Sequence, residues 1–308
     1  MRHPCRVLDD PLLVAGALAG TVLDGREVRV LSSGVAPSPV LVVDCGADEV
    51  LAAWASARQA VDRTARWPVV VTDWNGGGSN DLFSRFSYGS GDQSPLAVCR
   101  RAETVDLESE LAALEAAADA WRCGGWDDWL RSQLERTAAN FGRAPALDEV
   151  KLALGIDPGQ CTLERWLFEW ELAAEANGAS PPAPYARHLD WFVPEGQPCA
   201  VVLLPTIHGW QAPAWLAFFG AEGEGRRERL VAVMRTWDER WGAELVAHWG
   251  TMLEFVVARP PTTVAEAFPV AVAHDLLARS TLRPAGLSVR DHARALVNRT
   301  SWFLHDRP

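Results

Sequence analysis

The stretch WDERWGAELVAHWGTMLEFVVARPPTTVAEAF, residues 237–268, decides the fold of this chain. Its first letters end a helical pattern, and AELVAH and MLEFVV then read as two strands with a turn at Trp249 and Gly250. Two strands joined by a short turn pair as an antiparallel hairpin. After the paired prolines, Thr262 or Thr263 can cap a following helix, because a threonine hydroxyl accepts a free N–H of the first turn. The stretch therefore predicts helix, hairpin and helix in succession.

The remainder of the C-terminal part, residues 185–308, continues this α/β pattern. Ser288 is a natural cap for the last helix. We expect strands at 199–206, 213–220 and 302–306, and helices at 226–242, 264–280 and 288–298.

The N-terminal part, residues 1–98, is also α/β. Runs rich in Val and Leu predict strands, and Val50, Leu51, Trp54, Ala57 and Val61 recur at helical spacing. A strand, a helix and a strand with short joints are typical of a parallel pair with a crossover connection. The last strand reads as an edge strand because a proline donates no hydrogen bond. The expected helices are 9–23 and 47–66, and the expected strands are 28–33, 40–45 and 67–74.

Residues 99–184 differ from both flanks. Four runs between residues 103 and 178 have helical period, and glycines separate them. Thr162 is a candidate cap for the last of these helices, and PPAPY at 181–185 reads as a stiff linker. The fold class expected is α/β or α+β: a mixed sheet with flanking helices plus an all-helical middle insertion. We expect residues 1–98 and 185–308 to pack as one body.

Composition narrows the function classes. The chain has 308 residues, a net charge of −11 and 48% hydrophobic residues, which is typical of a globular protein. An acidic chain repels phosphate backbones, so we expect no nucleic-acid partner. No apolar run approaches the ~20 residues that cross a bilayer, so we expect no membrane span. Six cysteines at irregular spacing favour free thiols and a cytoplasmic protein.

Catalytic signatures are missing from the sequence. We find no nucleophile-elbow, zinc-protease, P-loop or zinc-deaminase motif, and we expect no cofactor and no metal. The glycine run Gly76–Gly78 follows a predicted strand, where backbone amides can bind phosphate. No Lys or Thr follows it at P-loop positions, so a flexible solvent loop is the better interpretation.

A few residues of the C-terminal part remain as candidates for chemistry. His208 follows an apolar strand and His248 ends one, and Glu254 lies in the partner strand of the hairpin. If His248 and Glu254 face each other across the turn, they can act as an acid and base pair. Arg259 can bind a carboxylate. Trp210 and Trp249 follow the two histidines and are candidate ligand-binding residues.

Several strings resemble bacterial domain-of-unknown-function family 4253. They are LLPTIHGWQAPAWLAFFGAEG from Leu203, the 237–268 stretch, and SVRDHARAL before WFLHDRP; EVLAAWASARQAVDRTARWPVVV from Glu49 carries a weaker likeness. The resemblance implies a bacterial, cytoplasmic protein of unknown activity. It transfers no catalytic residue.

Two functions remain open. The leading hypothesis is a non-enzymatic module, immunity-like or regulatory, that binds a protein partner or a small ligand. It rests on the missing catalytic motifs, the acidic charge and the 15 tryptophans. The alternative is an enzyme that uses the His/Glu/Arg residues named above. The oligomeric state is left open.

Overall fold

The computed structural model describes residues 7–31, 38–72, 94–120, 126–193, 196–216, 218, 221 and 225–307. These residues form two compact units. The sheet unit comprises residues 1–107, 189–260 and 300–308, and the helical unit comprises residues 108–188 and 261–299. The chain therefore enters the helical unit twice, and the two units cut across the three parts read from the sequence.

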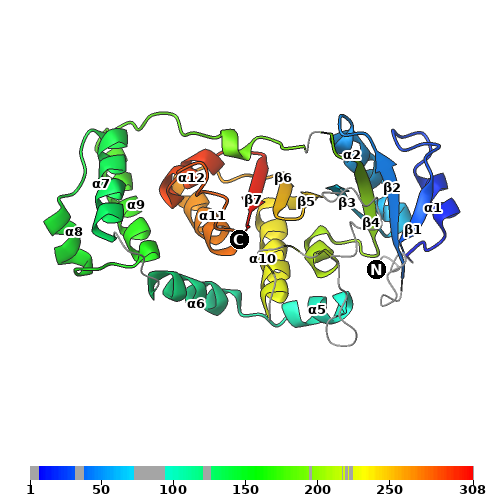
Figure 1. The fold of residues 1–308 in the computed structure, drawn as a ribbon, viewed down its shortest axis with the longest axis horizontal. Helices are drawn as coiled ribbons and strands as arrows, with labels where there is room; N and C mark the ends of the chain where they lie inside the picture. The colour runs from blue at the N-terminus through cyan, green and yellow to red at the C-terminus, as the bar shows by residue number, and fades with distance from the viewer. Residues whose placement is uncertain are drawn as a thin grey trace. The chain divides into compact units, whose positions relative to one another are not determined.

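A seven-stranded mixed sheet organises the sheet unit, as the sequence predicts for the fold class (Figure 1). Its strand order is β1-β2-β4-β3-β5-β6-β7. Only β3 and β5 pair in parallel; the other neighbours are antiparallel. Strands from both ends of the chain thus share one sheet. Their bounds are Val28–Leu31, Val40–Cys45, Trp67–Thr72, Cys199–Leu204, Ala243–His248, Met252–Val257 and Ser301–His305 for β1 to β7.

β2 and β3 run in the same direction with α2 between them in the chain, as expected for a crossover unit, but the expectation that they pair directly is wrong. β4 lies between these strands and pairs antiparallel with both. All six residues of β4 are buried, so the strand gains from a neighbour on each side. The local pattern of strand, helix and strand in residues 40–72 cannot predict that a strand beginning at residue 199 lies between β2 and β3.

The expectation that β3 is an edge strand is also wrong, because β3 lies between β4 and β5. Every residue of β3 is buried. The register with β5 covers only Val70 and Val71, so the missing N–H of Pro68 falls outside that ladder. A proline is tolerated in an interior strand at such a place.

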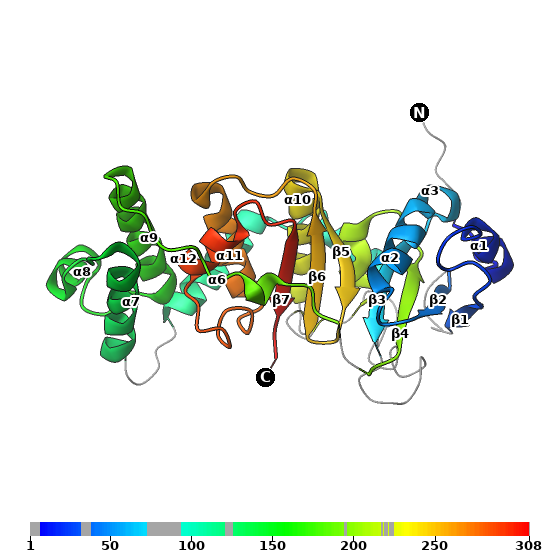
Figure 2. The same ribbon diagram turned by 90° about the horizontal axis from the view of Figure 1, so that it is seen from above.

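Helices cover both faces of the sheet. α2 (Val50–Gln59) and α10 (Arg226–Trp241) lie on opposite faces, as the views in Figures 1 and 2 show. Trp237 of α10 meets the ring of Phe255 at 5.9 Å and that of Trp302 at 5.6 Å, both edge-on. Aromatic pairs in this geometry add to the hydrophobic contact. The smaller helices of this unit are α1 (Pro11–Ala17), α3 (Val61–Thr64) and α5 (Pro95–Ala102).

The strand expected at 213–220 is wrong where the structure describes it. Residues Gly209–Ala214 form a short 3-10 helix, η3. Pro213 cannot donate to a strand ladder, which disfavours pairing there. Gly209 lies directly against the Trp67 indole, since a Cβ on this glycine would come within 2.4 Å of the ring. The glycine run Gly76–Gly78 lies outside the described residues.

The helical unit contains two groups of helices. The first comprises α6 (Leu107–Ala120), α7 (Trp126–Phe141), α8 (Leu147–Leu154) and α9 (Gln160–Ala176); the second comprises α11 (Val264–Leu277) and α12 (Val289–Leu296). The first group has a small apolar core made of Leu130, Leu134, Val150, Leu163 and Leu167. Apolar residues at three- and four-residue spacing build this core, as expected for amphipathic helices.

The structure confirms two of the three helix N-caps that the sequence predicts. Thr263 caps α11 and Ser288 caps α12, both in complete capping boxes, so these two predictions are confirmed. The cap expected at Thr162 is wrong, because α9 begins at Gln160. Asp119 of α6 accepts the N–H of Cys161 at 2.6 Å. A side chain distant in sequence therefore takes the role that the local pattern gave to a threonine.

Candidate functional site

His208 and Trp210 lie together at η3 of the sheet unit. The two rings stack with their centroids 5.3 Å apart, and the His208 side chain is exposed. Arg235 lies over the Trp210 ring at 5.9 Å. Burial raises the pKa of nearby Asp238 and Glu244 raises it further, while His208 and Arg259 act to lower it. This group is a partly exposed cluster of mixed charge.

Glu254 and Trp249 form a second, buried group. Trp249 Nε1 donates to Glu254 Oε2 at 2.8 Å, and the backbone N–H of Phe192 donates to Oε1 at 2.6 Å. Burial raises the pKa of Glu254 to about 7 against the effect of these two hydrogen bonds. The carboxyl therefore joins the segment before β4 to the hairpin.

The expected pairing of His248 with Glu254 is wrong. In the hairpin register His248 lies opposite Leu253, and Glu254 lies opposite Ala247. Residues directly opposite share a face and successive residues alternate, so the two side chains project to opposite faces of the sheet. His248 accepts the N–H of Gly250 through Nδ1 at 3.2 Å. The turn, and not the glutamate, fixes the orientation of this imidazole.

Arg259 has a structural contact at the end of α10. Its guanidinium donates to the backbone oxygens of Asp238 at 3.2 Å and Glu239 at 3.0 Å. A cation at this position satisfies carbonyl groups that the helix leaves unpaired. Of the residues predicted as a site, His208 and Arg259 thus both lie near Asp238. Glu254 and Trp249 form a separate group, and His248 projects to the other face of the sheet.

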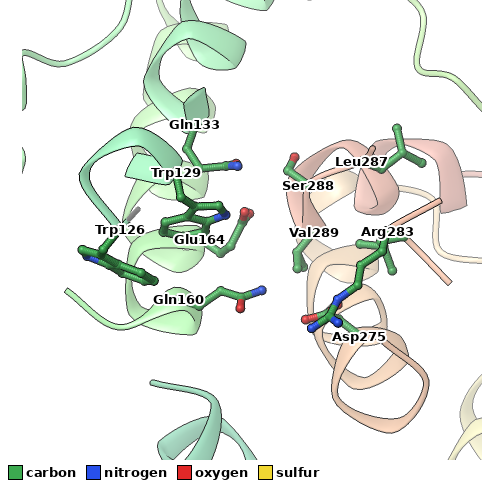
Figure 3. Close-up of a pocket in the computed structure, with 11 residues that line it drawn as sticks. Trp126, Trp129, Gln133, Gln160, Glu164, Asp275, Arg283, Leu287, Ser288 and Val289 are labelled. Atoms are coloured by element: carbon green, nitrogen blue, oxygen red, sulfur yellow. The ribbon is translucent and has the colours of Figure 1, made fainter. Parts of the chain in front are cut away.

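A pocket of about 300 Å³ lies in the helical unit, between helices of its two groups (Figure 3). This volume is at the lower end of the range for small-molecule sites. One side of the pocket comes from α7 and α9, and the other side comes from α11, α12 and the segment between them. Its lining residues are Trp126, Trp129, Gln133, Gln160, Glu164, Asp275, Leu282, Arg283, Leu287, Ser288 and Val289.

Two tryptophans form the aromatic part of the pocket. Trp126 and Trp129 stand one helical turn apart on α7, and their rings stack with centroids 4.5 Å apart. The three-residue spacing places both on one face of the helix. Trp129 also packs on the apolar core of α7, α8 and α9, which holds its ring in place.

Gln133 follows on the same face of α7, one turn after Trp129. Its side chain is 7% exposed, and its Oε1 atom has no hydrogen-bond partner among the described residues. A buried amide oxygen without a partner costs about 1–3 kcal/mol. Because Gln133 lines the pocket, a ligand that donates a hydrogen bond would remove this cost.

Glu164 is the buried acid of the pocket. Arg290 Nη1 contacts its Oε2 atom at 2.6 Å, and Arg290 Nε contacts Glu171 Oε1 at 2.9 Å. Burial raises the pKa of Glu164 to about 7 even though the Arg290 charge acts to lower it. Arg294 completes the network through Glu171 and Glu175, at 2.8 and 2.6 Å. These ion pairs fix α9 against α12 and hold the Glu164 carboxyl at the pocket.

Asp275 and Arg283 stand on the opposite side of the pocket from Glu164 (Figure 3). Burial raises the pKa of Asp275, and the charges of Arg279 and Arg283 act to lower it. The Arg283 side chain is exposed. Among the described residues, no group of three His, Cys, Asp or Glu side chains has the arrangement of a metal site.

Residues 200–306 match the family model described as a domain of unknown function, DUF4253. The resemblance read from the sequence is thereby confirmed for the C-terminal part. No curated protein and no solved structure matches the chain. Within the part of the chain that the structure describes, no helix is both long and apolar enough to span a bilayer. The matched range contains one wall of the pocket, with Asp275 and Arg283, whereas Trp129 and Glu164 precede it.

The sequence reading missed this site. A signal was present in the W-x-x-W-x-x-x-Q pattern of α7, which puts Trp126, Trp129 and Gln133 on one helical face. The same pattern is common in helices that simply pack. What makes it a site is the approach of α11 and α12 from more than a hundred residues away, which no local pattern indicates.

Proposed function

We propose that this protein is a non-enzymatic binding module that holds a small organic molecule in the pocket of the helical unit. The observation that carries this proposal is the buried, unpartnered Oε1 of Gln133 beside the stacked Trp126 and Trp129. Binding sites combine apolar or aromatic walls with a few fixed polar groups. This pocket has both, and the ion pairs of Arg290 hold one wall in place.

The enzyme alternative receives less support. Both oxygens of Glu254 accept hydrogen bonds from Trp249 and Phe192, and the register directs His248 to the other face. Arg259 is engaged with the last carbonyls of α10. A catalytic acid and base need a shared position for the reacting atoms, and these contacts provide none.

We further propose that the protein works in the bacterial cytoplasm. The cysteines that the structure describes are free thiols, and Cys45, Cys99 and Cys199 are buried. Burial raises the pKa of Cys45 and of Cys99 to about 12. Unreactive, reduced thiols agree with a reducing compartment.

A ligand screen tests the binding proposal. The purified full chain is mixed with pooled metabolites of the native host, and bound molecules are detected by saturation-transfer NMR and by a shift of the melting temperature. We expect at least one saturable ligand whose binding is lost in W129A. The matched control is W170A, which removes a partly exposed tryptophan of α9 that does not line the pocket and should leave binding unchanged. A screen with no hit, or a hit that W129A leaves intact, contradicts the proposal.

A further inference from the structure

The charges of the pocket are already balanced by the protein. Glu164 is paired with Arg290 at 2.6 Å. Asp275 stands beside Arg283 on the other side of the pocket (Figure 3), and the charge of Arg283 acts against the rise in pKa that burial gives Asp275. Because each acid of the pocket has an arginine beside it, neither wall offers an unpaired countercharge to a charged ligand, so the pocket favours a neutral molecule.

The uncharged polar groups define what such a molecule must offer. Gln133 and Gln160 both line the pocket, and each amide carries an acceptor oxygen and a donor NH₂ group. A hydroxyl group donates and accepts at the same time, so it pairs with an amide in either of the two orientations that rotation of the amide gives. The Oε1 atom of Gln133, which has no partner among the described residues, can only accept, so the ligand must supply a hydrogen-bond donor there.

The aromatic groups define the shape of the molecule. Trp126 and Trp129 stack with an interplanar angle of 28°, and Trp129 stands beside Glu164 in the wall (Figure 3). The face of an indole carries negative charge density, so it attracts the weakly positive C–H bonds of a saturated ring. A ring with C–H bonds on one face and hydroxyl groups around its edge meets both requirements.

We infer that the pocket binds a neutral sugar, with a pyranose ring against Trp129 and its hydroxyl groups bonded to Gln133, Gln160 and Glu164. This inference rests on the proposed function and specifies its ligand class. The cavity of about 300 Å³ accommodates one or two such rings. Charged sugars and phosphate esters are disfavoured by the internal pairing of Glu164 with Arg290.

Calorimetric titration of the full chain with defined probes tests this inference. The sugar probes are glucose, galactose, N-acetylglucosamine, maltose and cellobiose; the other probes are adenosine, phenylalanine and arginine. We expect saturable binding of at least one sugar and no comparable binding of the other three.

Two variants separate a binding role from a packing role. Q133L removes the amide that lacks a partner, so it should weaken sugar binding at least tenfold without lowering the melting temperature. W129A should also weaken binding, and W170A, whose tryptophan does not line the pocket, should not. The melting temperature of Q133L distinguishes the two roles. If Gln133 only packs in the core, Q133L should lower the melting temperature and leave the sugar affinity of the folded protein unchanged.

The failures are distinguishable. Binding of adenosine or an amino acid that depends on Gln133, with no sugar bound, overturns the sugar inference and leaves the binding proposal intact. Sugar binding that Q133L and W129A do not change also overturns it. If neither these probes nor the metabolite screen yields a ligand, both proposals are wrong.

Discussion

Replacing Arg290 with methionine should destabilise the helical unit more than any change at a surface ion pair. The Arg290 side chain is about 1% exposed and contacts Glu164 at 2.6 Å and Glu171 at 2.9 Å. Removing one partner of a buried pair leaves an uncompensated charge, which typically costs about 3–5 kcal/mol. Glu171 retains Arg294 at 2.8 Å, so most of the cost falls on Glu164.

The cost of R290M should depend on pH. Without Arg290, the pKa of Glu164 should rise further above about 7, because burial then acts against ionisation without that countercharge. At about pH 8 the Glu164 carboxyl must either stay ionised without a countercharge or take up a proton from a solution of low proton concentration. In both cases the full penalty of about 3–5 kcal/mol applies. At about pH 5 the carboxyl is neutral, and the remaining penalty is a lost hydrogen bond of about 1–3 kcal/mol.

Urea unfolding at the two pH values measures these differences, with hydrogen exchange of α9 and α12 amides as the probe of the helical unit. Urea is preferred to guanidinium because it does not screen charges. The control is R165M, which breaks the partly exposed Arg165–Glu115 pair at 3.1 Å and should cost no more than ~1 kcal/mol. The reasoning is refuted if R290M costs no more than R165M, or if its cost is the same at both pH values.

Other expectations concern protonation, packing and thiols. Because the folded-state pKa of Glu164 is raised from 4.5 to about 7, its contribution to stability is present below about pH 4.5 and is lost as the pH rises to about 7. The urea midpoint of the wild type should therefore fall between these pH values, and the midpoint of E164Q should change less with pH. Burial lowers the pKa of His274 to about 3 and that of His292 well below its usual value. Both rings should therefore stay neutral by ¹⁵N NMR through the pH range in which an ordinary histidine titrates, and their contribution to stability is lost as the pH falls below about 6.5; a ring that titrates near its ordinary value contradicts this. G209A should destabilise by about 1–3 kcal/mol in urea melts, because its Cβ would overlap the Trp67 ring. Thiol titration of denatured, non-reduced protein should count six cysteines; two or fewer would refute the cytoplasmic proposal.

Three histidines of the helical unit lie in contact with one another, and this arrangement contributes to the lowered pKa values of His274 and His292. His188 Nε2 and His292 Nδ1 are 2.8 Å apart, and His292 Nε2 and His274 Nδ1 are 3.0 Å apart. A neutral imidazole has one donor and one acceptor nitrogen, so His292 can bond to both neighbours only by donating to one and accepting from the other. The sequence spacing of 104 and 18 residues between these pairs gives no hint of the chain of three rings.

Local chemistry was sufficient for much of the fold. The hairpin of β5 and β6, the helix α10 and the caps Thr263 and Ser288 follow from patterns within about twenty residues. Such patterns are reliable because hydrophobic period and capping hydrogen bonds act between near neighbours in the chain. The mixed sheet with flanking helices followed from the same signals.

The candidate site was not accessible in this way. The expectation for His248 and Glu254 failed on a single step of register, and a one-residue shift moves a side chain to the other face of a sheet. The pocket combines Trp129 and Gln133 of α7 with Asp275 and Arg283 from the end of the chain.

The sequence by itself determined the local elements, their caps and the character of the sheet. The tertiary structure alone decided the insertion of β4 between β2 and β3, the cap that Asp119 provides for α9, and the meeting of Glu164 with Arg290. The physical reason is the range of the forces. Turns, caps and periodicity depend on residues a few positions apart, whereas burial and ion pairing depend on which surfaces the whole chain brings together.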